Sequence, residues 1–111
     1  MKLSDIISSN SAISVKKAAL AYDYVAQNLP KGGHIEISFD SIEDFTSAFA
    51  NAFIGKLYMN FDPTILNGVL SFSSINTESV WYQKIQNAIR FGSDATLRNY
   101  HQSNLTVLIT S

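Results

Sequence analysis

Apolar residues recur at steps of three and four between Ser14 and Pro30, which is the spacing of an amphipathic helix. The hydroxyl of Ser14 is suited to cap this helix, because it can accept from free backbone N–H groups of the first turn. Pro30 and the Gly32-Gly33 pair would end it. The pattern predicts a helix over Val15–Asn28, with one apolar face formed by Val15, Ala18, Ala19, Tyr22, Val25, Ala26 and Leu29.

Segments in which apolar and polar residues alternate predict the strands. The clearest is His34–Phe39, where every second residue is apolar, as in a strand with one buried face. Leu3–Ile7 is a weaker candidate, since serines interrupt it early. The strands that we expect are therefore Leu3–Ile7, His34–Phe39, Val69–Phe72 and Leu105–Thr110.

Bulky apolar residues spaced four apart predict a second helix after these first strands, with a stripe formed by Phe45, Phe49, Phe53, Leu57 and Phe61. Asp62-Pro63 joins a capping acid to a proline suited to the first helical position, which predicts one helical turn over Thr64–Asn67, ending at Gly68. Asp94–Gln102 is a candidate for a further short helix.

A third helix is expected after residue 76, capped by Asn76 or Thr77 and stopped by Gly92. Helices that alternate with strands indicate an α/β fold. We expect residues 1–111 to form a single domain with a mixed sheet of about four strands and helices packed against it. The residues expected to be buried together are Ile37, Phe49, Phe53, Trp81 and Ile85.

The composition changes this picture in one respect. Charged residues make up 15% of the 111-residue chain and hydrophobic residues 46%, whereas a typical domain is about 25% charged. The small charged fraction suggests that a partner covers part of the surface. The net charge of -1, with scattered Lys and Arg, disfavours nucleic acid as that partner.

Because there is no cysteine, no signal-peptide run and no apolar stretch of membrane-span length, we expect a cytoplasmic protein that does not bind membranes.

Catalytic and metal-binding patterns are weak. The two histidines, His34 and His101, have no second ligand at helical spacing, so we expect no metal site. No Gly-x-Ser-x-Gly motif or P-loop is present, and Lys31-Gly32-Gly33 is typical of a turn. We expect neither an enzyme nor a cofactor.

The hydroxyls of Thr46 and Ser47 stand at the start of the second helix and have two possible roles. A hydroxyl there normally caps the helix. The same position also favours an anion, because free N–H groups and the helix dipole favour negative charge, including that of an added phosphoryl group.

The order of elements around this helix resembles the STAS-like family DUF4325. The similarity covers about residues 34–91 and leaves 93–111 as an extension. Its most specific part is "FTSAFANAFIGKL", and the matching segments are Ile35–Phe39 with the loop to Ile42, Phe45–Leu57, Val69–Phe72 and Trp81–Ile89.

This resemblance implies a single STAS-like domain and a bacterial regulatory module that binds other proteins. The best understood STAS domains are anti-sigma-factor antagonists, which bind a kinase-type ATPase and are switched by phosphorylation of a hydroxyl that corresponds in position to Ser47, with Thr46 as its neighbour. The antagonist pattern Asp-Ser-Ser-Gly reads Thr46-Ser47-Ala48-Phe49 here, so its acid and its glycine are missing.

On this interpretation, the partner is a protein, such as a histidine-kinase-like ATPase or an anti-sigma-type protein. It would dock on the loop Asp40–Asp44 and on an exposed helix face in which Ile54 and Tyr58 form an apolar patch. Two alternatives stay open: a binder of a small anionic ligand or nucleotide at the Ser47 helix start, and a homodimer or larger homo-oligomer that pairs through Leu105–Thr110. The residues expected to act are Ser47 and Thr46, and for the partner surface Asp40, Glu43, Asp44, Asn51, Ile54 and Tyr58.

Overall fold

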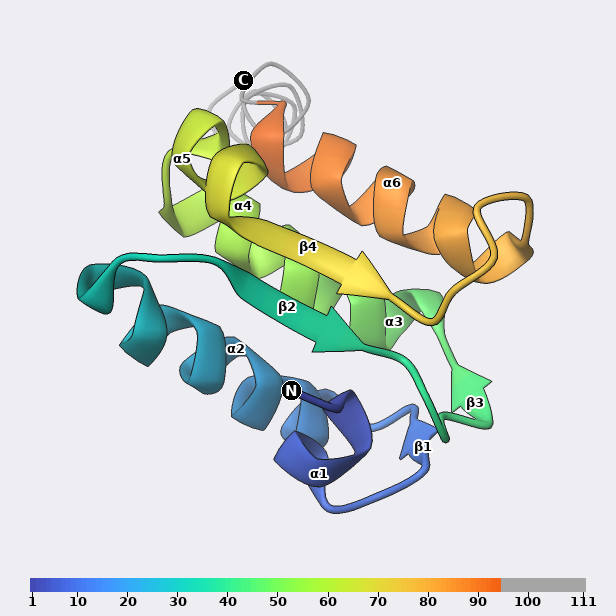
Figure 1. Cartoon of the computed structure of the whole chain (residues 1–111). Helices are drawn as coiled ribbons and strands as arrows, with labels where there is room; N and C mark the ends of the chain where they lie inside the picture. Colours follow the sequence, from blue (N-terminus) through green and yellow to red (C-terminus); the bar gives the residue numbers. More distant parts are fainter. Residues whose placement is uncertain (95–111) are drawn as a thin grey trace, which may run out of the picture.

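The structure is a computed structural model that describes residues 1–94 (Figure 1). Helix α2 has the bounds that the sequence predicted, and the Ser14 hydroxyl caps it by accepting from the backbone N–H of Lys16 at 3.1 Å and of Lys17 at 3.3 Å. The first half of the chain contains α1 (Leu3–Ile7), β1 (Ser11–Ala12), α2 (Val15–Asn28), the 3₁₀ turn η1 (Leu29–Lys31) and β2 (Ile35–Ser38).

The helix with the phenylalanine stripe is also present, but its middle turn is wider than expected. Three segments follow one another without a break, and the central one is a π-helix, whose hydrogen bonds span five residues. The second half contains β3 (Asp44–Phe45), α3 (Ser47–Ala50), the π-helical η2 (Asn51–Gly55), α4 (Lys56–Asn60), α5 (Pro63–Val69), β4 (Leu70–Ser73) and α6 (Val80–Ser93).

The expected mixed sheet of about four strands is wrong for the described residues. Their strands form two separate parallel pairs, β1 with β3 and β2 with β4. β1 and β3 have only two residues each, which is too short to extend into the other pair. Leu3–Ile7, expected as a strand, is helix α1, because Leu3 and Ile7 lie one turn apart and both are fully buried. Only Lys2, just before it, bridges to β2 at Ser38.

The helices lie on one face of the β2–β4 pair. In Figure 1, α3 and α4 run behind the two strands, α2 lies beside β2, and α6 lies beside β4. The opposite face of the strands is polar: Glu36 is exposed, and the His34 ring nitrogen Nε2 lies 2.7 Å from Ser71 Oγ. The described part of the chain is therefore an α/β domain whose core lies between one strand pair and its covering helices.

The predicted core is largely confirmed. Ile37, Phe49, Phe53 and Ile85 are fully buried, while Trp81 is half-buried at the margin of the same cluster. The aromatic rings meet mostly edge to face, as in the contact of Phe49 with Phe53, whose ring centroids are 6.1 Å apart. Such contacts add stabilisation beyond the burial of apolar area.

Gly92 was expected to stop the third helix, but α6 continues through it to Ser93. Its role is close packing. A Cβ at Gly92 would lie 2.2 Å from the carbonyl oxygen of Gly55 and 2.9 Å from Cβ of Tyr58. The absence of a side chain therefore allows α6 to lie directly against η2 and α4.

The predicted caps are confirmed in part. Asp62 caps α5, since its Oδ1 accepts from the backbone N–H of Thr64 at 2.9 Å, although the helix is longer than the expected single turn. Neither Asn76 nor Thr77 caps α6. Ser79 does, accepting from the backbone N–H of Tyr82 at 3.2 Å, while Asn76 Oδ1 accepts from Glu78 N–H in the turn before it.

The expected helix over Asp94–Gln102 and the expected strand over Leu105–Thr110 lie outside the described residues, apart from Asp94 itself. Among the helices that are described, none has both the length and the apolar character needed to cross a membrane.

Candidate functional site

The candidate site lies where β2 and β4 end, at the carboxyl edge of the parallel pair. The chain leaves β2 through a loop that leads to β3 and α3, and it leaves β4 through a loop that leads to α6. Both loops lie at the same end of the strands in Figure 1. In open α/β folds, this edge is where loops and helix starts meet and where binding sites form.

Thr46, and not Ser47, caps the helix at this edge. Thr46 has an extended backbone, and its Oγ1 accepts from the backbone N–H of Phe49 at 3.1 Å. Ser47 is the first residue inside α3; its side chain is exposed, and its hydroxyl makes no hydrogen bond with any residue from 1 to 94. The two adjacent hydroxyls therefore have different roles: one completes the helix, and the other is exposed and has no hydrogen-bond partner within residues 1–94.

The loop before α3 is anchored by its backbone and by one apolar side chain. Ile42 is buried, and its N–H donates to the carbonyl of Phe39 at 3.1 Å. The N–H of Glu43 donates to the carbonyl of Asn10 at 2.8 Å, and the N–H of Thr46 donates to that of Ala12 at 3.1 Å. The β1–β3 pair, which the sequence did not suggest, thus holds the loop against the start of the chain.

Three carboxylates project from this anchored loop, and all three side chains are exposed. Asp40 lies 3.2 Å from Lys2 Nζ, and Asp44 Oδ2 accepts from Ser11 Oγ at 3.1 Å. Glu43 has no side-chain partner among the described residues. The Lys2–Asp40 pair is about half exposed on both sides, so water screens it and it leaves the loop open to other charges. The loop is an acidic surface next to the exposed hydroxyl of Ser47.

The expected apolar patch of Ile54 and Tyr58 is wrong. Asn51 is exposed as expected, but Ile54 is fully buried and Tyr58 is 3% exposed. The reason is that η2 and α4 pack against both α2 and α6, so the helix is buried on more than its phenylalanine face. The Tyr58 hydroxyl donates to Asn67 Oδ1 at 2.8 Å, and burial raises the pKa of that hydroxyl.

The surface that was expected to dock a partner is accordingly polar. We call its exposed residues the acidic edge: Asp40, Glu43, Asp44, Ser47 and Asn51. The nearby cation of Lys84 is used inside the fold, since its Nζ donates to the carbonyl of Phe45 at 2.8 Å and so ties α6 to β3. The charge of the acidic edge is therefore set by its carboxylates.

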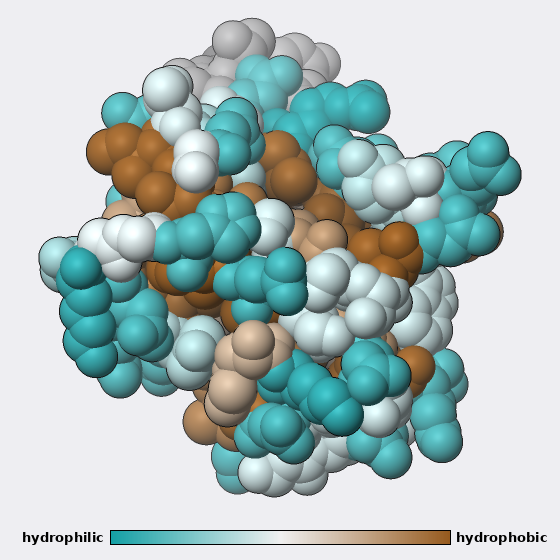
Figure 2. Space-filling view, in the orientation of Figure 1, coloured by the Kyte–Doolittle hydropathy of each residue, from teal (hydrophilic) through white to brown (hydrophobic). Residues whose placement is uncertain are grey.

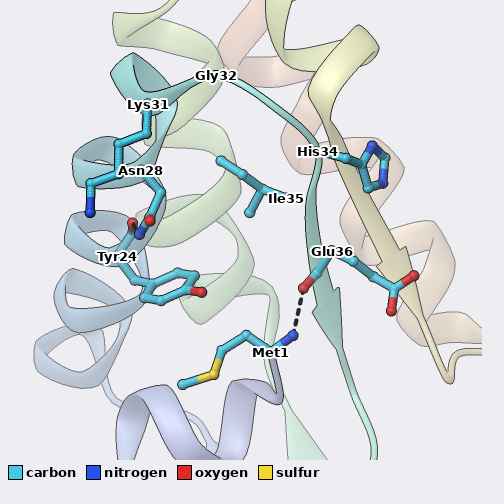
Figure 3. Close-up of a pocket in the computed structure, with 8 residues that line it drawn as sticks. All are labelled: Met1, Tyr24, Asn28, Lys31, Gly32, His34, Ile35 and Glu36. Carbon is cyan, nitrogen blue, oxygen red and sulfur yellow. Dashed lines mark hydrogen bonds between the residues drawn. The ribbon is translucent and has the colours of Figure 1, made fainter.

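A pocket of about 290 Å³ lies elsewhere, between the end of α2 and the start of β2. In Figure 3, the side chains of Tyr24 and Asn28 lie on one side of the strand, whereas those of His34 and Glu36 point away on the other. At the lower end of the pocket in Figure 3, the Met1 amino group donates to the Glu36 carbonyl at 3.0 Å. The lining residues are Met1, Tyr24, Asn28, Lys31, Gly32, His34, Ile35 and Glu36. None of them is a Ser, Thr or Cys nucleophile, and Ser47 is not among them.

Within residues 1–94, no three His, Cys, Asp or Glu side chains come close enough together to hold a metal ion. His34 is paired with Ser71, and His101 lies outside the described residues.

Sequence reasoning missed two features of this edge. The choice between Thr46 and Ser47 as the cap depends on which residue has extended backbone. The sequence carries no signal for this choice, because the residue three positions after either hydroxyl has a backbone N–H to donate. The β1–β3 pair has no periodic signal, because two residues are too few to alternate.

Comparison with known proteins gives one match. A family model described as a STAS-like domain of unknown function (DUF4325) matches residues 18–80, which is more than half of the chain. The matched region starts in α2, includes the loop and Ser47, and ends at the first residue of α6. No curated protein and no solved structure matches the chain.

Proposed function

The chain belongs to the STAS-like domain family DUF4325, and we propose that it is a cytoplasmic, non-enzymatic regulatory module that binds another protein through the acidic edge. The observation that carries this proposal is the anchored loop with its exposed carboxylates beside the exposed hydroxyl of Ser47. A loop fixed by its backbone presents side chains in one arrangement, so little ordering free energy is lost when a partner binds.

The charge of the acidic edge indicates the chemistry of the partner. Asp40, Glu43 and Asp44 favour a partner with a basic patch, because complementary charges speed encounter and fix orientation. A histidine-kinase-like ATPase or an anti-sigma-type protein with Lys or Arg at its docking face would fit. The apolar residues first expected on this surface are buried, so the interface would be polar and sensitive to salt.

The chemistry at Ser47 supports binding rather than catalysis. A nucleophilic serine requires a base within hydrogen-bond reach, and no described histidine or carboxylate bonds to this hydroxyl. His34, the described histidine, precedes β2 at the opposite end of the strand. The nearby hydroxyls of Thr46 and Ser79 are occupied as helix caps.

We propose that an added negative charge at Ser47 would regulate binding. A phosphoryl group there would sit at the start of a helix, where free N–H groups and the dipole tolerate it, so the fold would be kept. The same group would add to the negative charge of Glu43 and Asp44 and change the fit to the partner. Phosphorylation of Ser47 is therefore proposed as a switch of binding.

Charge-neutralising variants test the binding surface. Asp40→Asn, Glu43→Gln and Asp44→Asn are combined in one variant, and the control combines Asp5→Asn, Asp23→Asn and Glu36→Gln, which are exposed elsewhere and change the net charge equally. The partner is first isolated from the source cell with the full chain and identified by mass spectrometry. Its affinity for both variants is then measured at low and high salt.

We expect the first variant to bind at least about tenfold more weakly than the control, with a smaller salt dependence. Equal affinities of the two variants would refute the acidic edge as the binding surface.

The pocket gives a second candidate function, the binding of a small anionic ligand. Its volume suits a small metabolite, and the Met1 amino group and Lys31 supply positive charge. A rise in melting temperature with phosphate, citrate or a nucleotide, abolished by Lys31→Gln, would favour it over protein binding.

A further inference from the structure

Strand β4 has an unpaired edge in the described part of the chain. β2 is hydrogen-bonded on both sides: the N–H of Phe39, just after it, donates to the Ser73 carbonyl at 2.9 Å, and the N–H of Ser38 donates to the Met1 carbonyl at 2.9 Å. Successive residues of a strand direct their backbone groups to opposite edges. Since Ser73 faces β2, the N–H and C=O of Phe72 point to the other side, where no strand lies among residues 1–94.

An apolar strip borders this edge. Figure 2 shows hydrophobic atoms at the surface in the band between β4 and α6. Half-buried apolar side chains from β4, the loop after it and α6 contact the core while keeping part of their surface exposed: Phe72, Ile75, Trp81 and Ile89. An open strand edge beside an apolar strip is the geometry that accepts one more strand.

The topology indicates where the next strand of the chain belongs. The connection from β2 to the parallel strand β4 passes through α3, η2, α4 and α5, and α6 packs against η2 and α4 on the same face. Parallel crossovers are right-handed in nearly all proteins. Two successive right-handed crossovers over the same face step in the same direction, so a strand that follows α6 falls on the open edge of β4.

The direction of α6 agrees with this placement. Lys84, near its start, bonds to the carbonyl of Phe45 at the carboxyl edge, whereas Gly92, near its end, lies against Gly55 and Tyr58. Asp94 therefore leaves the helix at the amino edge of the strands, where a strand parallel to β4 has to begin (Figure 1).

We propose that the open edge of β4 accepts residues 105–110 of the same chain as a third parallel strand. The sequence there, Leu-Thr-Val-Leu-Ile-Thr, has Leu105, Val107 and Ile109 in alternation, which would place apolar side chains on the strip. The ten residues from 95 to 104 span up to roughly 33 Å when extended, enough to reach the open edge of β4 from the end of α6. A third strand would also remove an edge that otherwise pairs with other molecules.

Amide hydrogen exchange of Phe72 in the full chain, measured residue by residue by NMR, tests this pairing. We expect the Phe72 N–H to exchange at least about 100-fold more slowly than an unstructured amide, because it donates to the added strand. The protection should not change on dilution, and cross-strand contacts between Phe72 and residues 106–108 should appear in the same spectra.

Val107→Asp and Leu108→Asp form a matched pair, since both replace an apolar residue by the same charge on opposite faces of the proposed strand. Val107→Asp should remove the protection of Phe72, because it places a carboxylate on the apolar strip, and Leu108→Asp should keep it. An unprotected Phe72 amide in the wild-type chain, protection that is lost on dilution as for pairing with a second copy, or equal effects of the two variants would each overturn the proposal.

Discussion

Replacing Gly92 by alanine tests the contact that brings α6 against the central helix. The added Cβ would meet the Gly55 carbonyl oxygen at 2.2 Å and Cβ of Tyr58 at 2.9 Å, both closer than real Cβ contacts allow. The nearest obstacle is a backbone atom, which cannot rotate away as a side chain does. The two helices would therefore have to separate, and the packing of Gly55 and Tyr58 against α6 would loosen.

Two opposing effects set the magnitude. Alanine is a better helix former than glycine by about 1 kcal/mol. Forcing extra volume into a close-packed site typically costs about 1–3 kcal/mol. Because the clash involves backbone on one side, we expect a cost near the upper end and a net loss of about 2 kcal/mol in the free energy of unfolding. For a domain of this size, each kcal/mol lowers the melting temperature by about 4–8 °C.

Gly68→Ala provides the control. Gly68 also lies inside a helix, α5, but a Cβ there would meet nothing within 4 Å. Alanine should therefore raise stability by about 0.5–1 kcal/mol. Thermal unfolding followed by circular dichroism compares both variants with the wild type. If Gly92→Ala melted as high as Gly68→Ala, the close approach of α6 to Gly55 would be refuted.

Four further predictions concern the core and the site. Phe53→Ala should lower the free energy of unfolding by about 3–5 kcal/mol, because the ring is fully buried, and a nearly unchanged denaturant midpoint would contradict that burial. Thr46→Ala should cost about 0.5–2 kcal/mol, whereas Ser47→Ala should change stability by less than about 0.5 kcal/mol; the reverse order in chemical unfolding would show that Ser47 is the cap. Ser47→Asp should fold with unchanged stability, since an acid suits the first helical turn, yet bind the partner more weakly in calorimetry, and undiminished affinity would remove the proposed switch. Burial raises the pKa of the Tyr58 hydroxyl, so the neutral form is favoured in the folded state; stability should fall as pH rises above about 10, less so for Tyr58→Phe, and parallel pH profiles of the two proteins would contradict this.

Local signals allowed α2 and β2 to be predicted from the sequence. Ser14 caps α2 and Pro30 lies just beyond its end, so both helix boundaries have a residue that marks them. The alternation of Ile35, Glu36 and Ile37 follows the one buried face of β2. Such patterns depend on contacts within a few residues, and these contacts are visible in the sequence.

The features of the fold that the sequence did not predict depend on tertiary packing. A single apolar stripe suggested one buried face for the central helix, but η2 and α4 pack against both α2 and α6, and Ile54 and Tyr58 are buried as well. Gly92 was expected to stop the third helix, because glycine often follows the last residue of a helix. In the structure it lies inside α6 and allows that helix to contact Gly55 of η2. Thr46 and Ser47 do stand at a helix start, as the sequence indicated, but which of the two hydroxyls caps it depends on a one-residue difference in backbone conformation.

Site-directed photo-crosslinking measures most directly whether the acidic edge binds another protein. The chain has no cysteine, so Ser47→Cys carries a single benzophenone label, and Gln27→Cys, exposed on α2, carries the same label as a control. Each labelled full-length protein is irradiated in an extract of the source cell, and the products are identified by mass spectrometry. We predict one dominant protein adduct from position 47 and none of that protein from position 27. The absence of an adduct at position 47, or the same adduct from both positions, would contradict the proposed function.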